Sequence, residues 1–525
     1  MTYRPLLAAF ALAVVSFGCS ALSQDSETSS WGRDEPAGEW GADAGGSYGD
    51  TGFSGGPSSD AGSGSFGSVG TGGGQDFAFF RKALDEGKIP APESIDAAGF
   101  FAEHYTSLPA PTCGKTFCLH GMFSVSPDYV RSGDWTLLQM GMNSPIDPAT
   151  ITKPPLELAV VLDRSGSMAE AGKMEFAKQG VQLLVDALGP ADRLTLISFD
   201  DEIVTEFGPA TVTDKAALKA KIAAIAPRGS TNLYDSLQAG YKAISTASEQ
   251  LQRRVIFLTD GLATAGNTDP KAIAKMSSDW NAKHLGLTTI GLGSNVSISL
   301  LRGLAEQGGG NFYYVEKVDA VKEVFTEELA FFVAPLAYDL ELTYTEMPTY
   351  STKTVHGTNL WTSFAGGGKV SIPSVFLVSR TSTKPGPTGG RRGGGSAIIA
   401  ELAATGKLPT SLHDVAKLSL KYRTPGSTTF ESQEVKVTHD GEPGVSPEGG
   451  SYDNKSVEKN TLVLGFFVAF RDAAKLAQTD KVAARTLLES FQTKMTTRLT
   501  GWTDEDLLDD LKILQKFIDV LKTAA

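Results

Sequence analysis

The apolar run 156–162 constrains the fold of this chain most, because of the residues that follow it. Its residues are mostly apolar at successive positions, which is typical of a strand buried on both faces of a parallel sheet. Asp163 follows the run directly, and Ser165 and Ser167 come at alternate positions in a loop that contains Gly166. Open α/β sheets place ligands at the carboxyl ends of their strands, so these three side chains are candidate ligands of a hard cation such as Mg²⁺.

Two later segments offer oxygen ligands of the same kind. Thr231 lies just before a predicted helix that begins at Leu233, and Asp260 directly follows a second apolar strand-like run, 255–259. The full candidate set lies on three separate loops and comprises Asp163, Ser165, Ser167, Thr231 and Asp260. This order of residues resembles the metal-ion-dependent adhesion site of the von Willebrand factor type A domain. The resemblance implies that the three hydroxyls contact a divalent cation, Mg²⁺ or else Mn²⁺ or Ca²⁺, while the two aspartates act directly or through water.

The segment 155–334 alternates between the two kinds of secondary structure. Strand-like runs are expected at 156–162, 194–199, 255–259, 287–291 and 312–315, and helices at 174–188, 215–225, 233–248 and 270–284, with 321–332 closing the series. Strands that alternate with helices are joined by right-handed crossovers, which build a parallel sheet with helices on its faces. We therefore predict an α/β fold with a doubly wound, mostly parallel sheet, as the resemblance to the type A domain also implies.

The regions on either side of this domain are predicted to form accessory structure. Residues 76–154 form an N-terminal segment, 335–450 are β-rich in pattern, and 451–525 are helical in pattern. The strands expected between 113 and 151 should join those after 336 in one body, because either group alone would leave sheet edges unpaired. The whole order is similar to that of a family of bacterial lipoproteins. In having β structure beside the type A domain, it is also similar to the heavy chains of inter-alpha-trypsin inhibitors.

The first residues have the pattern of an export signal. Arg4 precedes an apolar run, 6–15, that is too short to span a bilayer, so residues 1–19 are predicted to be a signal rather than an anchor. The sequence around Cys19 resembles a bacterial lipoprotein cleavage site, at which the cysteine is lipidated; the alternative is an ordinary secretory signal that is cut nearby. Residues 20–75 are rich in Gly and Ser with few large apolar residues, so they are predicted to be a disordered tether.

The two remaining cysteines, Cys113 and Cys118, are expected to form a local disulfide. The chain has three cysteines, and with Cys19 assigned to lipid these two are left as an even pair. In an exported protein such a pair favours a disulfide over a metal site.

Together these features predict an exported, membrane-tethered protein that binds a protein partner offering an acidic residue to the metal. The net charge of −13 at pH 7 argues against binding to nucleic acid. The alternatives are a structural envelope protein whose metal only clamps the loops, and a metal-dependent hydrolase. We expect no enzyme, because a nucleophilic Ser165 needs a positioned base, and His284 is expected at a helix end away from the strand tips.

We expect the protein to be lipid-anchored in a bacterial cell envelope. Ser20 follows Cys19. In some lipoproteins an aspartate at this position causes retention at the inner membrane, so by analogy the serine favours the outer membrane. A secreted or periplasmic protein is the alternative.

If Cys19 is lipidated, replacing it should release the protein from membranes. The Cys19→Ala protein is expected to lose fatty-acid labelling and to move from the detergent phase to the aqueous phase in a two-phase extraction. Ser20→Ala leaves the cysteine in place and should partition as the parent does. A Cys19→Ala protein that still carries fatty acid and partitions with detergent would contradict lipidation.

Overall fold

The structure is a computed structural model. It describes residues 67–70, 73–74, 77–104, 107–146, 154–293, 296–315, 325, 335–378, 397–407, 411–439 and 450–523. Cys19 with the predicted signal, most of the predicted tether and the segment 321–332 apart from Phe325 lie outside the described residues.

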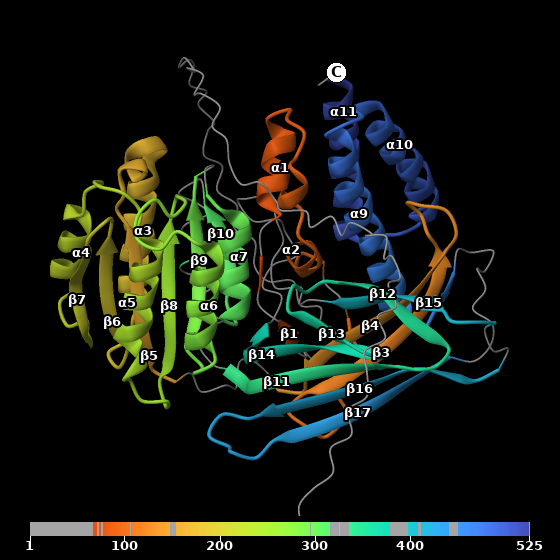
Figure 1. The fold of residues 1–525 in the computed structure, drawn as a ribbon, viewed down its shortest axis with the longest axis horizontal. Coiled ribbons are helices and arrows are strands. Elements are labelled where there is room, and N and C mark those ends of the chain that lie inside the picture. Colours follow the sequence, from red (N-terminus) through yellow and green to blue (C-terminus); the bar gives the residue numbers. More distant parts are fainter. Residues whose placement is uncertain are drawn as a thin grey trace, which may run out of the picture. The chain divides into compact units, whose positions relative to one another are not determined.

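One of the two sheets has seven strands and is mostly parallel (Figure 1). Its order is β2-β10-β9-β8-β5-β6-β7, with bounds Gly73–Gly74, Asn311–Val315, Gly286–Leu292, Gln252–Thr259, Leu156–Asp163, Arg193–Phe199 and Ile203–Thr211. Every neighbouring pair is parallel except β6 and β7, which are antiparallel. The predicted α/β class and the mostly parallel sheet are confirmed.

Helices cover both faces of this sheet, as buried parallel strands require. They are α3 (Lys173–Ala187), α4 (Lys215–Ala224), α5 (Leu233–Ser245), α6 (Pro270–Asn281) and α7 (Ile298–Gln307), and the 3₁₀ segment η3 (Gly166–Gly172) precedes α3. Successive residues of β5 enter different cores. Val160 packs with apolar residues of α3 and α4, whereas Val161 packs with those of α5, α6 and α7.

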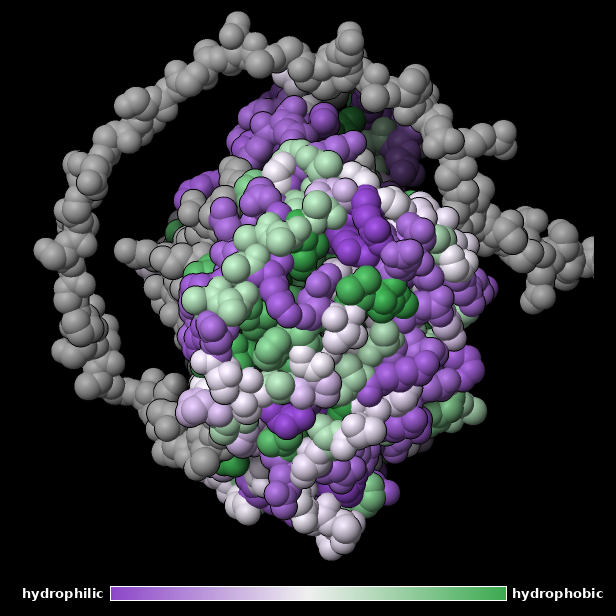
Figure 2. Space-filling model, turned by 90° about the vertical axis from the view of Figure 1, so that its left-hand side faces the viewer, coloured by the Kyte–Doolittle hydropathy of each residue, from purple (hydrophilic) through white to green (hydrophobic). Residues whose placement is uncertain are grey.

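The sequence prediction missed β7 and α7. Strand β7 is an edge strand whose residues are exposed or half-buried, so it lacks the continuous apolar run that marks the inner strands. Figure 2 looks at this side of the molecule and shows hydrophobic residues exposed among hydrophilic ones. Helix α7 has an amphipathic pattern that the prediction did not use, with Leu301, Leu304 and Ala305 buried.

The second sheet has eleven strands, and its neighbouring strands pair antiparallel throughout the described residues. Its main path is β12-β15-β4-β1-β14-β11-β16-β17, with bounds Tyr350–His356, Ile398–Ala404, Asp134–Ser144, Gly67–Gly70, Gly367–Val378, Pro335–Glu346, His413–Arg423 and Glu431–His439. Three strands lie off this path: β13 (Trp361–Phe364), β3 (Cys118–Pro127) and β18 (Ser451–Tyr452). Since β3 and β4 share a sheet with the strands after 335, the prediction of one β body is confirmed. A disulfide joins Cys113 to Cys118 where β3 begins.

Three short strands correct the predicted boundaries. Strands β1 and β2 lie within 20–75, which was predicted to be disordered, and β18 lies within 451–525, which was predicted to be helical. The disorder prediction rested on the lack of apolar side chains to bury. Strand pairing needs only backbone N–H and C=O groups, and β1 and β2 obtain these partners from strands of the two sheets.

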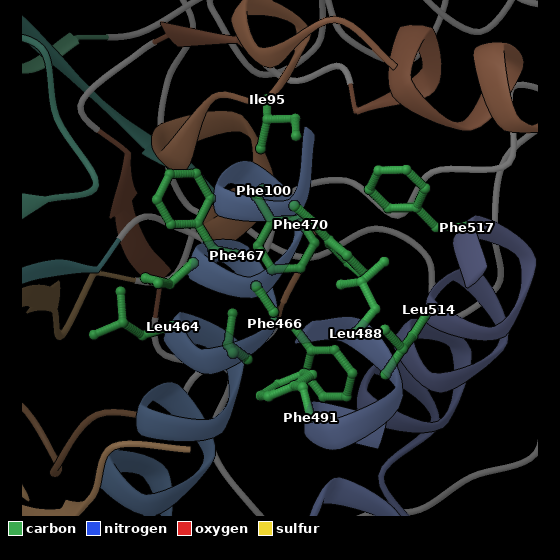
Figure 3. Packing of buried hydrophobic residues seen from close by; sticks show 14 of the residues in the cluster. Ile95, Phe100, Leu464, Phe466, Phe467, Phe470, Leu488, Phe491, Leu514 and Phe517 are labelled. Atoms are coloured by element: carbon green, nitrogen blue, oxygen red, sulfur yellow. The ribbon is translucent and has the colours of Figure 1, made fainter. Parts of the chain in front are cut away.

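The N-terminal helices pack with the C-terminal ones around an aromatic core. These helices are α1 (Ala78–Asp85), α2 (Ala97–Ala102), α9 (Lys455–Ala477), α10 (Lys481–Arg498) and α11 (Glu505–Thr523). The Phe470 ring lies within 6.2 Å, between centroids, of the rings of Phe77, Phe80, Phe100 and Phe466. Figure 3 shows Phe470 among the side chains of this core, with Phe100, Phe466 and Phe467 around it. Within the described residues, no helix is both long and apolar enough to cross a membrane.

Because β1, β3 and β4 complete the large sheet, its later strands should not fold without them. A fragment of residues 155–334 is expected to unfold cooperatively on its own, since its strands and helices bury two cores of their own. A fragment of residues 336–450 is expected to show collapsed, poorly dispersed NMR spectra, whereas residues 67–525 should give dispersed ones. A cooperative, well-dispersed 336–450 fragment would contradict this prediction.

Candidate metal centre

Asp163 is the last residue of β5, and its carboxylate stabilises the turn that leads into η3. Its Oδ1 accepts a hydrogen bond from the Ser165 backbone N–H at 2.7 Å, and its Oδ2 accepts one from Thr259 Oγ1 at 2.6 Å. The first bond closes the tight turn that presents Ser165 and Ser167, and the second fixes the carboxylate against the end of β8. Each oxygen of Asp163 therefore already has a donor within the chain.

Backbone hydrogen bonds join the loop after β5 to the loop before α5. The Gly166 N–H donates to the Gly229 carbonyl at 3.1 Å, and the Arg228 N–H donates to the Arg164 carbonyl at 2.6 Å. The Asp200 carboxylate, buried at the end of β6, holds both arginines: Oδ2 lies 3.2 Å from Arg164 Nε and 2.6 Å from Arg228 Nε. These contacts bring the Thr231 loop over the end of β5.

Thr231 is held just outside helix α5. Asn232 is the N-cap residue, and its side chain accepts a hydrogen bond from the Asp235 N–H at 3.3 Å. The Thr231 N–H donates to Thr264 Oγ1 at 2.9 Å, and its carbonyl accepts from the Thr264 N–H at 2.9 Å. The loop that follows Asp260 thus folds back onto Thr231.

The side-chain oxygens of the three loops meet beside Gly261. Ser165 Oγ and Ser167 Oγ lie 3.2 Å apart, and Ser167 Oγ donates to Asp260 Oδ1 at 2.8 Å. A Cβ atom placed on Gly261 would lie 3.7 Å from Thr231 Oγ1 and 4.0 Å from Ser167 Oγ. Because glycine has no side chain, the space between these oxygens stays open. The structure thus brings all of the predicted ligands together, and their chemistry, hydroxyls with carboxylates, fits a hard divalent cation.

The site is buried on the protein side and open to solvent at one residue. Ser167 is exposed, whereas the other four candidate ligands are buried: Asp163, Ser165, Thr231 and Asp260. The pKa of Asp163 is raised to about 6, chiefly by burial; hydrogen bonds from Thr259 and Ser165 partly offset this rise, and the nearby Asp260 charge adds to it. A divalent cation would supply the positive charge that these buried carboxylates need.

Three residues of the site were missed by sequence reasoning. Lys173 Nζ donates to Asp260 Oδ2 at 2.7 Å and to the Ser167 carbonyl at 3.2 Å, while Thr259 and Asp200 make the contacts described above. Thr259 had a usable signal, since it is a polar residue at the end of a buried apolar run. Lys173 had none, because its partner is 87 residues away in sequence.

A cavity of about 790 Å³ lies at the other end of the strands. Its lining includes Gln252 and Arg253 at the start of β8, and His284, Tyr338 and Arg423. His284 Nε2 lies 2.9 Å from Asp339 Oδ1. Since Asp163 and Asp260 follow the carboxyl ends of their strands, this cavity is separate from the candidate metal centre.

Comparison with known proteins agrees with this geometry. Residues 157–327 match the von Willebrand factor type A domain. This part of the chain is a von Willebrand factor type A domain. Such domains mediate protein–protein interactions, often through a divalent metal.

The chain is also similar to curated proteins over stretches longer than this domain. The chain is 23% identical over 291 residues to YfbK of Escherichia coli (strain K12), covering 53% of this chain and 49% of that protein. It is 27% identical over 252 residues to inter-alpha-trypsin inhibitor heavy chain H3 of Pongo abelii, covering 45% of this chain and 28% of that protein. The chain therefore spans about half or less of these curated relatives.

Among solved structures, a von Willebrand factor type A protein from Catenulispora acidiphila gives a TM-score of 0.49. The two chains are 12% identical, and the match covers 76% of this chain and 89% of the other.

If the gathered oxygens bind a cation, millimolar Mg²⁺ should raise the unfolding temperature. A ligand that binds only the folded state at a hundred times its Kd stabilises it by about 2.7 kcal/mol. Asp163→Ala should abolish the rise and Thr231→Ala should reduce it, because the latter removes one hydroxyl and little packing.

Thr195→Val is the matched control for these variants. Thr195 is equally buried in the same domain but lies near the start of β6, so its variant should keep the full response to Mg²⁺. An Asp163→Ala protein that responds to Mg²⁺ as the parent does, measured by differential scanning calorimetry, would contradict the site.

Proposed function

We propose that the protein binds an acidic protein partner through a divalent cation held at this site. Ser165, Ser167 and Thr231 would hold the cation by their hydroxyls, with Asp163 and Asp260 acting directly or through water. The observation that carries the proposal is that both carboxylates are already engaged within the chain. Asp163 accepts from Thr259 and Ser165, and Asp260 accepts from Ser167 and Lys173.

Neutral ligands leave positive charge on a cation. Hydroxyl oxygens donate no net charge, and the negative charge of Asp260 is shared with the Lys173 ammonium. A cation held in this way supplies an electrophilic centre that accepts a carboxylate oxygen from a partner. Mg²⁺ suits the oxygen donors best, and Mn²⁺ or Ca²⁺ has the same preference for oxygen.

The surface next to the site gives a partner further contacts. Leu262, two residues after Asp260, is 55% exposed, although it is a large apolar side chain. Glu170 on η3 and Arg228 on the neighbouring loop are also exposed. An apolar anchor beside charged groups supports the docking of a protein segment rather than of a small anion.

Two alternative functions have less support. A structural clamp would need the metal to connect loops that are otherwise separate, but backbone hydrogen bonds from Gly166 and Arg228 already join them. A hydrolase would need a base, yet His284 lines the cavity at the opposite strand ends and pairs with Asp339. Within the described part of the chain, no three or more His, Cys, Asp or Glu side chains gather as a metal site. We therefore propose a binding protein and not an enzyme.

We further propose that the protein acts in a bacterial cell envelope, tethered to the outer membrane through lipid on Cys19. The apolar run 6–15 and the Gly/Ser-rich stretch after Cys19 support this proposal. The Cys113–Cys118 disulfide suits an oxidising compartment outside the cytoplasm. A secreted or periplasmic form would be consistent with the same disulfide. The net charge of −13 supports a protein partner over nucleic acid.

Partner capture should require both the cation and acidic groups on the partner. Immobilised protein is expected to capture a partner from envelope extract in Mg²⁺, and to lose it with chelator or with Asp163→Ala. Extract whose carboxyl groups have been converted to amides should also give no capture. Thr195→Val, which leaves the metal site intact, should capture as the parent does.

One outcome would show that the partner binds at another surface of the protein. If Asp163→Ala loses its stabilisation by Mg²⁺ but still captures the partner undiminished, the metal is a structural clamp. Capture that survives amidation of the extract would exclude a partner carboxylate as the ligand.

A further inference from the structure

Lys173 places a buried positive charge against one of the candidate metal ligands. Its Nζ atom lies 2.7 Å from Asp260 Oδ2, and the two side chains are 6% and 0% exposed. The same ammonium donates to the Ser167 carbonyl at 3.2 Å. Lys173 is the first residue of α3, so the helix holds it at a fixed distance from the loop after β5.

The other cations near the site are committed elsewhere. Arg164 and Arg228 both face Asp200, at the end of β6. Within the described part of the chain, Lys173 is the cation that faces Asp260; it also lies 3.6 Å from Oε2 of the exposed Glu170. Asp163 is buried beside this pair and accepts only from neutral donors. An ion pair at this depth is screened little by solvent, so it alters the field at the site strongly.

The pairing also decides which oxygens remain for a cation. Asp260 Oδ2 faces Lys173, and Asp260 Oδ1 accepts the Ser167 hydroxyl proton. Because that proton points at Asp260, Ser167 Oγ acts only as an acceptor toward its other neighbours: one lone pair faces Ser165 Oγ at 3.2 Å, and the other is left for a cation. The Asp260 carboxylate is thus engaged within the chain, and the Ser167 hydroxyl is the group that faces a cation.

We propose that Lys173 is a positioning residue that keeps Asp260 in the outer shell of the bound cation and lowers the negative charge of the site. This inference rests on the proposed metal site. Lys173 thereby weakens cation binding, but it preserves the positive charge that attracts a partner carboxylate. Without the ammonium, Asp260 is free to turn toward the cation and bind it directly.

Removing the charge of Lys173 should therefore tighten metal binding. Lys173→Gln keeps an N–H donor and most of the side-chain length, but it removes the positive charge. Loss of one unit charge a few ångströms from a divalent cation should lower the Kd for Mn²⁺ at least about tenfold, even at the effective dielectric of a protein surface. Free Mn²⁺, measured by electron paramagnetic resonance, gives this Kd directly.

A spectroscopic signature separates positioning from a general electrostatic effect. In Lys173→Gln, Asp260 should replace a water on the bound Mn²⁺, so the count of exchangeable waters should fall by one in deuterium-exchange spin-echo measurements. Asp260→Asn should reduce Mn²⁺ affinity more in the Lys173→Gln background than in the parent, since only there is the carboxylate a direct ligand.

Lys178→Gln is the matched control. Lys178 lies on the same helix, is similarly buried, and pairs with Glu175 Oε1 at 3.0 Å and the Ala223 carbonyl at 3.1 Å, away from Asp260. Its variant should keep the parent Kd and water count. Lys173→Arg keeps the charge and should also bind Mn²⁺ as the parent does. If Lys173→Gln does not fold, Lys173→Met gives the same comparison, because its unbranched apolar side chain fits the buried stem.

The outcomes distinguish this inference from the proposed function. A Lys173→Gln protein that binds Mn²⁺ no more tightly than Lys178→Gln overturns the role of Lys173 alone. Equal tightening in Lys173→Arg also overturns it, because the charge would then not be the cause. A parent protein that binds no Mn²⁺ overturns the inference together with the metal site.

Discussion

The candidate site depends on the backbone hydrogen bonds that hold β5 between β6 and β8. Asp163 lies opposite Phe199 of β6, and Leu162 lies opposite Leu258 of β8. This register sets Asp163 beside Thr259 and next to the loop that begins at Asp260. A slip of one residue would point Asp163 to the other face of the sheet and bury it against the wrong helices. The oxygens lie together because the parallel strands end at one edge of the sheet, so a metal is not needed to assemble them.

The features that could be predicted from the sequence were those encoded by neighbouring residues. Asp163 and Asp260 were found because a polar residue ends an apolar run, which is a local pattern at the ends of β5 and β8. The Lys173–Asp260 ion pair could not be found in this way, because it follows from where α3 begins relative to β8. Strand β1 was missed for a different reason, since backbone pairing leaves no trace in hydrophobic composition. The structure thus brings the predicted ligands together, whereas the charge around them became visible only in the fold.

The two ends of the type A domain have different surroundings. At the amino ends of its strands, the buried Arg254 of β8 lies over the Phe376 ring of β14, 4.7 Å from its centroid, and His284 pairs with Asp339 of β11. Those contacts join the domain to the eleven-stranded sheet. At the carboxyl ends, Ser167 and Leu262 are exposed beside the candidate metal centre. The fold therefore uses one end of the domain for attachment and leaves the other end, which carries the candidate metal centre, exposed.

Strands β1 and β2 also determine how a pulling force applied before residue 67 would be distributed between the two sheets. Residues 67–70 pair with β4 and β14 in the larger sheet, and residues 73–74 pair with β10 in the sheet of the type A domain. Tension on the chain before residue 67 is therefore carried by inter-strand hydrogen bonds of both sheets. Part of it reaches β10, which is joined through β9 to β8, the strand that ends at Thr259. If the proposed tether precedes residue 67, a pull on it would strain the same sheet that positions the candidate metal ligands.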